Sequence, residues 1–155
     1  MKIRTFAFLL LFLIISCDGT LGGFETRRFP ISKQKLNSAF DTLFSEHPEY
    51  KIPDKWKSYN VWGYWGKNSL EARTFYLKSN PEEMYYVSFI GDEEMLKDTT
   101  HIDIAIRSVF TRRHLKWLKE EDCDDKEKER IEKRFDREII SKLEEYTNVK
   151  AIRQH

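Results

Sequence analysis

Residues 101–108 read HIDIAIRS and carry the clearest structural pattern in the sequence. Ile102, Ile104 and Ile106 alternate with other residues, and alternate side chains of a β-strand point to opposite faces of its sheet. The pattern therefore predicts a strand with one buried face. The other face holds smaller or polar side chains, namely His101, Asp103, Ala105 and Arg107. Because antiparallel sheets often leave one face in water, we expect this second face to be solvated.

Three more candidate strands precede this one. They are Tyr59–Gly66 (YNVWGYWG), Ala72–Lys78 (ARTFYLK) and Glu83–Ile90 (EMYYVSFI). The two connections between these three strands are short and contain Asn, Ser or Pro, which favours hairpin turns. The last connection, Gly91–Thr100, is longer and acidic. Four consecutive strands with mostly short connections predict an antiparallel meander.

Two amphipathic helices are predicted, one before and one after the four strands in the sequence. The first follows Ser32, which suits a helix cap, and ends at His47-Pro48 because proline disfavours helical geometry in the residue before it. Its apolar side chains recur three or four residues apart: Leu36, Ala39, Phe40, Leu43 and Phe44. The second spans Lys128–Tyr146 and has an apolar stripe of Ile131, Phe135, Ile139, Ile140, Leu143 and Tyr146. Residues 109–118 predict a short helix or an irregular turn.

This order of elements predicts one α+β domain over residues 31–155. Its antiparallel sheet has about four strands in a meander, and the N-terminal helix and the long C-terminal helix pack on one face. The expected core consists of Leu36, Phe40, Leu43, Phe75, Leu77, Ile102, Ile104, Ile106, Ile131, Phe135, Ile139 and Leu143.

The first seventeen residues have a different character. Lys2 and Arg4 are followed by an unbroken apolar run, Phe6–Ile15, and then by Ser16 and Cys17. The run is shorter than the roughly 20 residues that a membrane-spanning helix needs. Its length is typical of the apolar centre of a signal peptide.

A basic start, an apolar centre and a small residue before cysteine resemble the lipobox signal of bacterial lipoproteins, although Ile14 stands where leucine is commonest. The resemblance covers residues 1–17 only. It implies that residues 1–16 are removed and that Cys17 carries acyl chains such as palmitate, which anchor the protein in the bacterial cell envelope. Asp18 favours the inner membrane in enterobacteria alone, so inner and outer membrane both stay open. An ordinary signal peptide or an uncleaved anchor is the alternative.

Residues 17–30 are expected to form the lipidated cysteine and a flexible tether, because they contain three glycines and no apolar periodicity. The chain has 27 basic and 26 acidic residues, and loss of Lys2 and Arg4 changes its net charge from +1 to −1. This balance gives no basic footprint for nucleic acid. The expected partners are therefore the membrane, through the lipid on Cys17, and a protein, peptide or glycan ligand.

No catalytic motif stands out, and no cofactor or metal site is predicted. His101 and Asp103 share a strand face, but a metal ion would need at least one more protein ligand, which the sequence does not place. Cys123 lies in EEDCDD (120–125), where neighbouring carboxylates oppose the thiolate and disfavour a nucleophilic role. The sequence therefore favours a non-catalytic protein.

Aromatic residues are concentrated around the first predicted strand. Trp62 and Tyr64 share one of its faces, and Tyr76 or Tyr85 on neighbouring strands would extend this set outward. Tryptophan and tyrosine offer a large contact area with a polar tip, so these four residues form a candidate binding surface. The alternative is that the rings cover the sheet or fill the core.

Together these features predict a lipid-anchored binding module of the cell envelope, with an immunity or inhibitor-type protein as one form of it. Two other functions stay open. One is a structural or assembly subunit of an envelope complex, and the other is a small hydrolase whose catalytic residues the sequence does not place.

Overall fold

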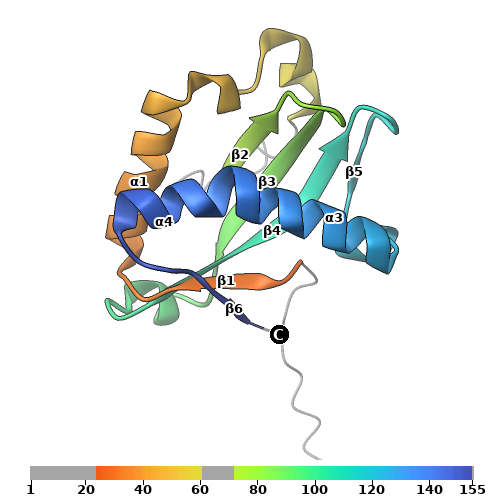
Figure 1. Ribbon diagram of the computed structural model, residues 1–155. Helices are drawn as coiled ribbons and strands as arrows, with labels where there is room; N and C mark the ends of the chain where they lie inside the picture. The colour runs from red at the N-terminus through yellow and green to blue at the C-terminus, as the bar shows by residue number, and fades with distance from the viewer. Residues whose placement is uncertain (1–23, 61–71, 155) are drawn as a thin grey trace, which may run out of the picture.

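The computed structural model describes residues 24–60 and 72–154. Figure 1 shows an antiparallel sheet with helices lying in front of it. The strands are β1 (Thr26–Phe29), β2 (Ala72–Leu77), β3 (Glu83–Ile90), β4 (Ile102–Thr111), β5 (Lys116–Leu118) and β6 (Ile152–Gln154). The α-helices are α1 (Lys33–Glu46), α3 (Asp125–Phe135) and α4 (Ser141–Thr147), and a π-helical turn, Asp136–Ile140, joins the last two. Short 3₁₀ turns are η1 (Pro48–Tyr50), η2 (Asp54–Tyr59), η4 (Met95–Lys97) and η5 (Glu120–Asp122).

The α+β class and the antiparallel sheet are confirmed, but the number of strands is not. Strands β2, β3 and β4 form the predicted meander and agree closely with three of the predicted segments. Within residues 24–60 and 72–154 the sheet has six strands in place of four, in the order β2-β3-β4-β1-β6, with β5 also paired to β4. Most of the first predicted strand, Tyr59–Gly66, lies outside the described residues, and Tyr59 itself ends η2.

Two short strands come from segments predicted to be irregular. The tether predicted for residues 17–30 includes the segment that forms β1, and β1 pairs with both β4 and β6. Its Arg27 is buried and donates from Nε and Nη2 to Asp136 at 2.7 and 3.0 Å, while Phe29 is fully buried. The tether prediction is therefore wrong for this stretch, because a buried ion pair and a buried ring fasten it to the helix side of the sheet.

The prediction of a short helix or an irregular turn over residues 109–118 is also wrong. This segment forms the end of β4, a turn, and β5, which pairs back on β4. A β-bulge interrupts the alternation in β4 and explains why its continuation beyond residue 108 was not predicted. Val87 pairs with Ile106 and Tyr86 pairs with Ser108, so Arg107 is an extra residue. After such a bulge the inward positions change from even to odd numbers. The apolar pair Val109 and Phe110 therefore lies on two opposite faces of one strand.

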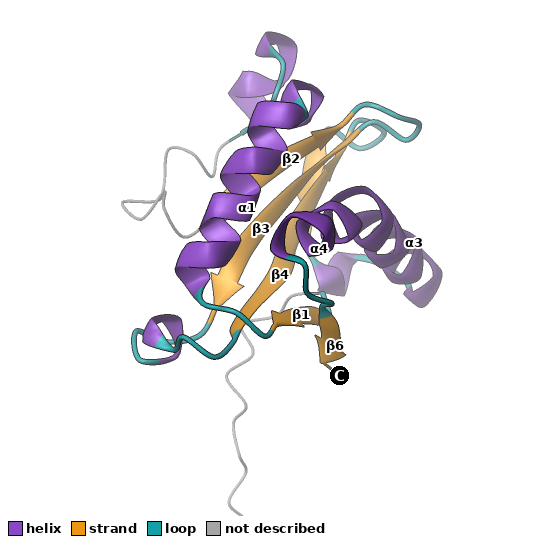
Figure 2. Cartoon of the chain, turned by 60° about the vertical axis from the view of Figure 1, so that its left-hand side comes forward, coloured by secondary structure: helices purple, strands orange, loops and turns teal. Residues whose placement is uncertain are grey.

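Helix α1 and the helices α3 and α4 pack on the same face of the sheet (Figure 2). Ser32 caps α1, as expected, by accepting a hydrogen bond from the backbone N–H of Lys35. Phe40 of α1 contacts Phe75 of β2, and Phe135 of α3 stacks on Tyr85 of β3. All twelve predicted core residues are buried.

The opposite face is less solvated than predicted. At one end, Trp56 and Tyr59 of η2 and Trp117 of β5 pack on Tyr76, Met84 and Phe110. Further along β4, Asp103 is 6% exposed and forms two hydrogen bonds of 2.8 Å with the guanidinium of Arg28. Small secondary elements and a long arginine side chain therefore cover a face that alternation alone assigned to water.

Candidate functional site

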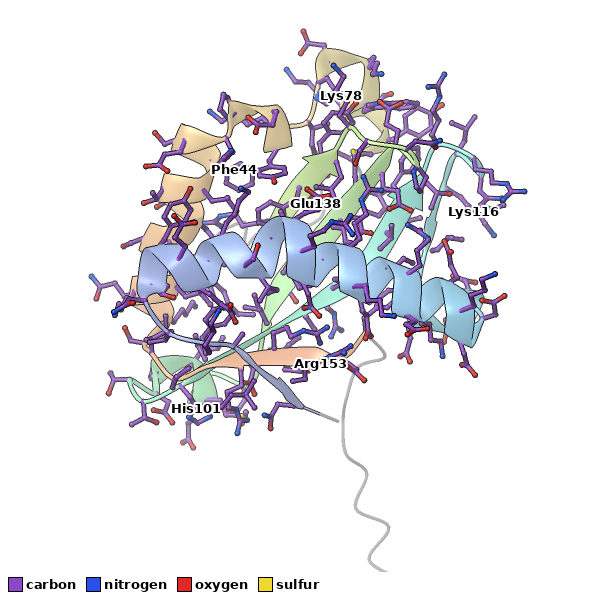
Figure 3. The ribbon with its side chains drawn as sticks, in the orientation of Figure 1. Phe44, Lys78, His101, Lys116, Glu138 and Arg153 are labelled. Carbon is purple, nitrogen blue, oxygen red and sulfur yellow. The ribbon has the colours of Figure 1, made fainter. Side chains whose placement is uncertain are left out.

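A groove of about 1140 Å³ lies at one end of the sheet. Three segments line it: the β2–β3 turn, the β4–β5 hairpin, and η5 with the first turns of α3. Lys78 and Lys116, which line it, lie toward this end of the molecule in Figure 3, and His101 lies at the other end. The groove is therefore built from segments that are far apart in the sequence.

A buried ion-pair network fixes the helix side of this groove. Glu83 begins β3, and its fully buried carboxylate accepts hydrogen bonds from Arg134 (2.7 Å), Arg130 (2.5 Å) and the hydroxyl of Tyr85 (2.9 Å). Arg134 also donates to the carbonyls of Ser79 and Pro81 and to the hydroxyl of Ser79. These contacts hold the β2–β3 turn against α3, so this wall of the groove is rigid.

The network also sets the protonation of its members. Burial and the neighbouring Glu83 carboxylate raise the pKa of Tyr85 well above its usual value, so its phenol keeps its proton and donates a hydrogen bond to Glu83. The hydrogen bonds that Arg130 donates to the Glu127 and Glu83 carboxylates outweigh burial and raise the pKa of Arg130. Both raised pKa values keep Tyr85 and Arg130 protonated near neutral pH, where they act as hydrogen-bond donors to Glu83.

Glu82, the residue before Glu83, projects to the other face of the sheet. Its carboxylate accepts from the indole N–H of Trp56 at 2.7 Å and from the hydroxyl of Tyr76, and it pairs with Lys55 at 2.7 Å and Arg112 at 3.2 Å. Burial opposes its ionisation, but the hydrogen bonds from Lys55, Tyr76 and Trp56 prevail and lower the pKa of Glu82 to about 2. The carboxylate is therefore a permanent anion that ties η2 to both hairpins.

The groove also carries basic side chains without such partners. Four lysine or arginine residues of its lining form no ion pair with any residue in 24–60 or 72–154: Lys78, Arg113, Lys116 and Lys126. All four are exposed. Of the carboxylates that line the groove, Glu82, Glu83 and Glu127 pair with cations, while Asp122 and Asp124 accept backbone N–H groups and keep their charge. Within the described residues, four cations and two carboxylates of the lining are therefore outside ion pairs, and the unpaired charge is net positive.

One buried hydroxyl at the groove is also unsatisfied. Thr111, at the end of β4, lines the groove and is 4% exposed. Its Oγ1 has no hydrogen-bond partner within the described parts of the chain. Buried polar groups are nearly always paired, so this hydroxyl marks a position where the folded protein alone leaves a polar group unmatched.

The groove contains a cysteine and a histidine but no nucleophile–base pair. Burial, together with Glu127 and Asp122, raises the pKa of Cys123, and its thiol donates to the carbonyl of Lys119 at 3.5 Å. A protonated thiol with an acidic surrounding is a poor nucleophile. Within the described ranges, no three His, Cys, Asp or Glu side chains come together to hold a metal ion. The arrangement is suited to binding charged groups and offers no constellation for bond cleavage.

The sequence-predicted binding residues do not form one surface. Tyr76 and Tyr85 are 6% and 0% exposed and lie on opposite faces of the sheet, so the expectation that they extend an outward aromatic patch is wrong. Their hydroxyls are committed to Glu82 and Glu83. Trp62 and Tyr64 lie outside the described residues, as does Cys17.

His101 and Asp103, the candidate metal-binding pair, lie away from the groove. Asp103 is committed to Arg28, and His101 Nδ1 lies 3.1 Å from a carboxylate oxygen of Asp98. Neither residue lines the groove. Sequence analysis missed the groove because the run Arg112–Lys116 was not recognised as a hairpin tip, although a basic run after an alternating strand was the available signal.

No family model, curated protein or solved structure matches this chain. None of the helices in the described residues is sufficiently long and apolar to cross a membrane. The site therefore has to be interpreted from its own chemistry.

Proposed function

We propose that the protein is a lipid-anchored binding module of the bacterial cell envelope, with its ligand held in the groove at the hairpin end of the sheet. The observation that supports binding is the set of four groove cations without a carboxylate partner in residues 24–60 and 72–154, beside the unpaired Thr111 hydroxyl. The signal-like sequence that ends at Cys17 supports the envelope location and the lipid anchor.

The rigid frame of the groove favours recognition over catalysis. Arg134 and Glu83 fix one wall through buried contacts, while the exposed cations remain available to a partner. A preformed site of this kind avoids the entropic cost of ordering itself when a ligand binds. An immunity or inhibitor-type protein, which blocks another protein at the membrane, is one form of this function.

A stable subunit of an envelope complex is less well supported. Among the described residues, the large hydrophobic side chains that are exposed are Met95, Leu115 and Ile152. They lie on η4, the β4–β5 hairpin and β6, at separate places rather than in one patch. Permanent interfaces bury contiguous apolar surface, which these scattered residues do not supply. The hydrolase alternative lacks a catalytic constellation at the groove.

The aromatic pair Trp62 and Tyr64 remains part of the proposal as a second candidate contact. Substitution of Trp62 by alanine in the lipidated protein tests it, with recovery of envelope partners by affinity capture as the measurement. Equal recovery with both proteins would remove Trp62 from the binding surface and leave the groove as the candidate.

The anchor is tested by replacing Cys17 with serine in the full-length chain. The wild-type protein is expected to start at Cys17, to carry the added mass of its acyl chains, and to partition into detergent; Cys17→Ser is expected to lose the acyl mass. Intact-mass spectrometry and detergent-phase partitioning measure these outcomes. A wild-type protein without acyl mass, or a Cys17→Ser protein that is processed and anchored identically, would rule out the lipid anchor.

A further inference from the structure

We propose that the groove binds an acidic, extended segment of a partner protein, with its carboxylates along the basic hairpin wall. This inference rests on the proposed binding function and adds the chemical class of the ligand. The basic wall is defined here as Lys78, which directly follows β2, together with Arg113 and Lys116 of the β4–β5 hairpin.

The cations of the groove fall into two groups, those in ion pairs within the protein and those outside them. The positive charge of the basic wall belongs to the second group. Arg112 is engaged by Glu82, and Arg130 by Glu83 and Glu127, so these arginines stabilise the fold. Lys78, Arg113 and Lys116 have no carboxylate within the 4.0 Å of an ion pair in the part of the chain that the structure describes, and all three are exposed. These three cations are therefore unpaired within the described residues, and a ligand that carries carboxylates would supply their counter-charge.

The distribution of the cations favours a chain over a small anion. A phosphate site usually gathers several N–H groups of one loop or helix start around a single centre. Here the charges come from the end of one strand, from two positions of a hairpin and, through Lys126, from α3. Several carboxylates that are separated along a peptide match such a spread better than one compact anion.

Two carboxylates of the groove argue against an anionic membrane surface as the ligand. Asp122 of η5 and Asp124, the N-cap of α3, also line the groove. A broad negative surface placed over the groove would meet these carboxylates and the basic wall together, and like charges would repel. An extended peptide can lie along the basic wall and present its own backbone N–H groups toward Asp122 and Asp124.

The test measures binding of fluorescein-labelled deca-glutamate to the full-length protein in neutral detergent by fluorescence anisotropy, with labelled deca-glutamine as the uncharged control. The variant Lys78→Gln/Arg113→Gln/Lys116→Gln removes three charges of the basic wall. The matched control, Lys35→Gln/Lys51→Gln/Arg137→Gln, removes the same residue types from exposed positions away from the groove. Thermal unfolding of both variants verifies that each is folded.

Deca-glutamate is expected to bind in a salt-dependent manner, and the groove variant is expected to weaken it about tenfold, since each exposed ion pair contributes modestly. The control variant is expected to change affinity less than about twofold. Absence of binding, equal losses in both variants, or equally tight binding of deca-glutamine would overturn the proposal.

Two soluble competitors separate the other sources of negative charge. Inorganic phosphate and glycerol 3-phosphate, the latter representing a phospholipid headgroup, are expected to displace deca-glutamate only at far higher concentration than unlabelled deca-glutamate. Displacement by either one at a similar concentration would replace the peptide proposal with a small-anion or lipid-headgroup site. These results are independent of the acyl mass on Cys17, so failure here and failure of the anchor are distinguishable.

Discussion

Glu82 and Glu83 are consecutive residues with opposite surroundings. Strand alternation sends Glu83 to the helix face, where its carboxylate is fully buried and its partner Arg134 is 5% exposed. Glu82 goes to the other face, where its two cationic partners, Lys55 and Arg112, are 58% and 68% exposed. The same chemical group therefore forms an interior network on one face and a surface clamp on the other.

The contrast shows that the energetic role of an ion pair depends on what surrounds its cation. A buried cation that loses its carboxylate stays desolvated and uncompensated, whereas an exposed lysine regains water. The Glu83 network should therefore control whether the hairpin end of the sheet is folded. The Glu82 clamp should adjust stability and leave the exposed cations of the groove free for a ligand.

The largest expected effect comes from the buried side of this comparison. Arg134→Met removes the donors to Glu83, Ser79 and Pro81 and leaves the Glu83 carboxylate buried with one arginine fewer. We expect a loss of about 3–5 kcal/mol in the free energy of unfolding. Urea denaturation of the full chain, followed by tryptophan fluorescence, measures this quantity.

The neighbouring Lys133→Met is the matched control. Lys133 pairs with Glu129 at 2.6 Å, but their side chains are 69% and 64% exposed. Its loss should change stability by less than about 0.5 kcal/mol. If the two variants were equally stable, burial would not distinguish the two kinds of ion pair in this protein.

The sequence allowed prediction of the elements whose pattern is regular and local. The alternation Ile102, Ile104, Ile106 and the cap Ser32 both depend on neighbours within a few residues, and both predictions were confirmed. The strand β1 was not predictable in this way, because the buried Arg27 pairs with Asp136 and Glu132, which are far along the chain. A short segment that depends on such a distant partner carries no periodicity of its own.

The candidate site was harder to predict than the fold. Its three walls meet only after the β2–β3 turn, the β4–β5 hairpin and α3 are packed together. The aromatic residues Tyr76 and Tyr85 gave the stronger signal in the sequence, yet strand packing buries both. Composition identifies residues that are able to bind, and tertiary contacts decide which of them remain available.

An intermediate effect is expected from the Glu82 clamp, and it depends on pH. The folded-state pKa of about 2 lies below the ordinary value of 4.5, so the clamp contributes its full stability above about pH 4.5 and loses it as pH falls toward 2. Glu82→Gln should lower the free energy of unfolding by about 1–2 kcal/mol at pH 7, because the amide keeps hydrogen-bond acceptance and loses the charge.

The measurement is urea denaturation of the wild-type and Glu82→Gln proteins from pH 7 to pH 2. The difference between them should shrink through the acid range to a small part of its pH 7 value near pH 2, where about half of the wild-type carboxyl is protonated in the folded state. A difference that is constant across this range would show that the clamp acts through shape rather than charge.

The smallest expected effect is a gain in the free energy of unfolding, and it comes from two buried hydroxyls, one on each face of the sheet. Thr111 is the cross-strand neighbour of Glu83, and Ser108 is the neighbour of Tyr86 on the other face. Both residues are buried, and neither hydroxyl has a hydrogen-bond partner in residues 24–60 and 72–154. Thr111→Val and Ser108→Ala should each stabilise the protein by about 1 kcal/mol, because each removes an unmatched polar group.

Ligand binding then separates these two hydroxyls. Only Thr111 lines the groove, so only Thr111→Val is expected to weaken deca-glutamate binding, by about threefold, while Ser108→Ala leaves it unchanged. Urea denaturation and fluorescence anisotropy measure the two quantities on the same samples. A loss of stability in Thr111→Val would mean that its hydroxyl is already paired in the free protein, and the groove would then have no unmatched group besides its cations.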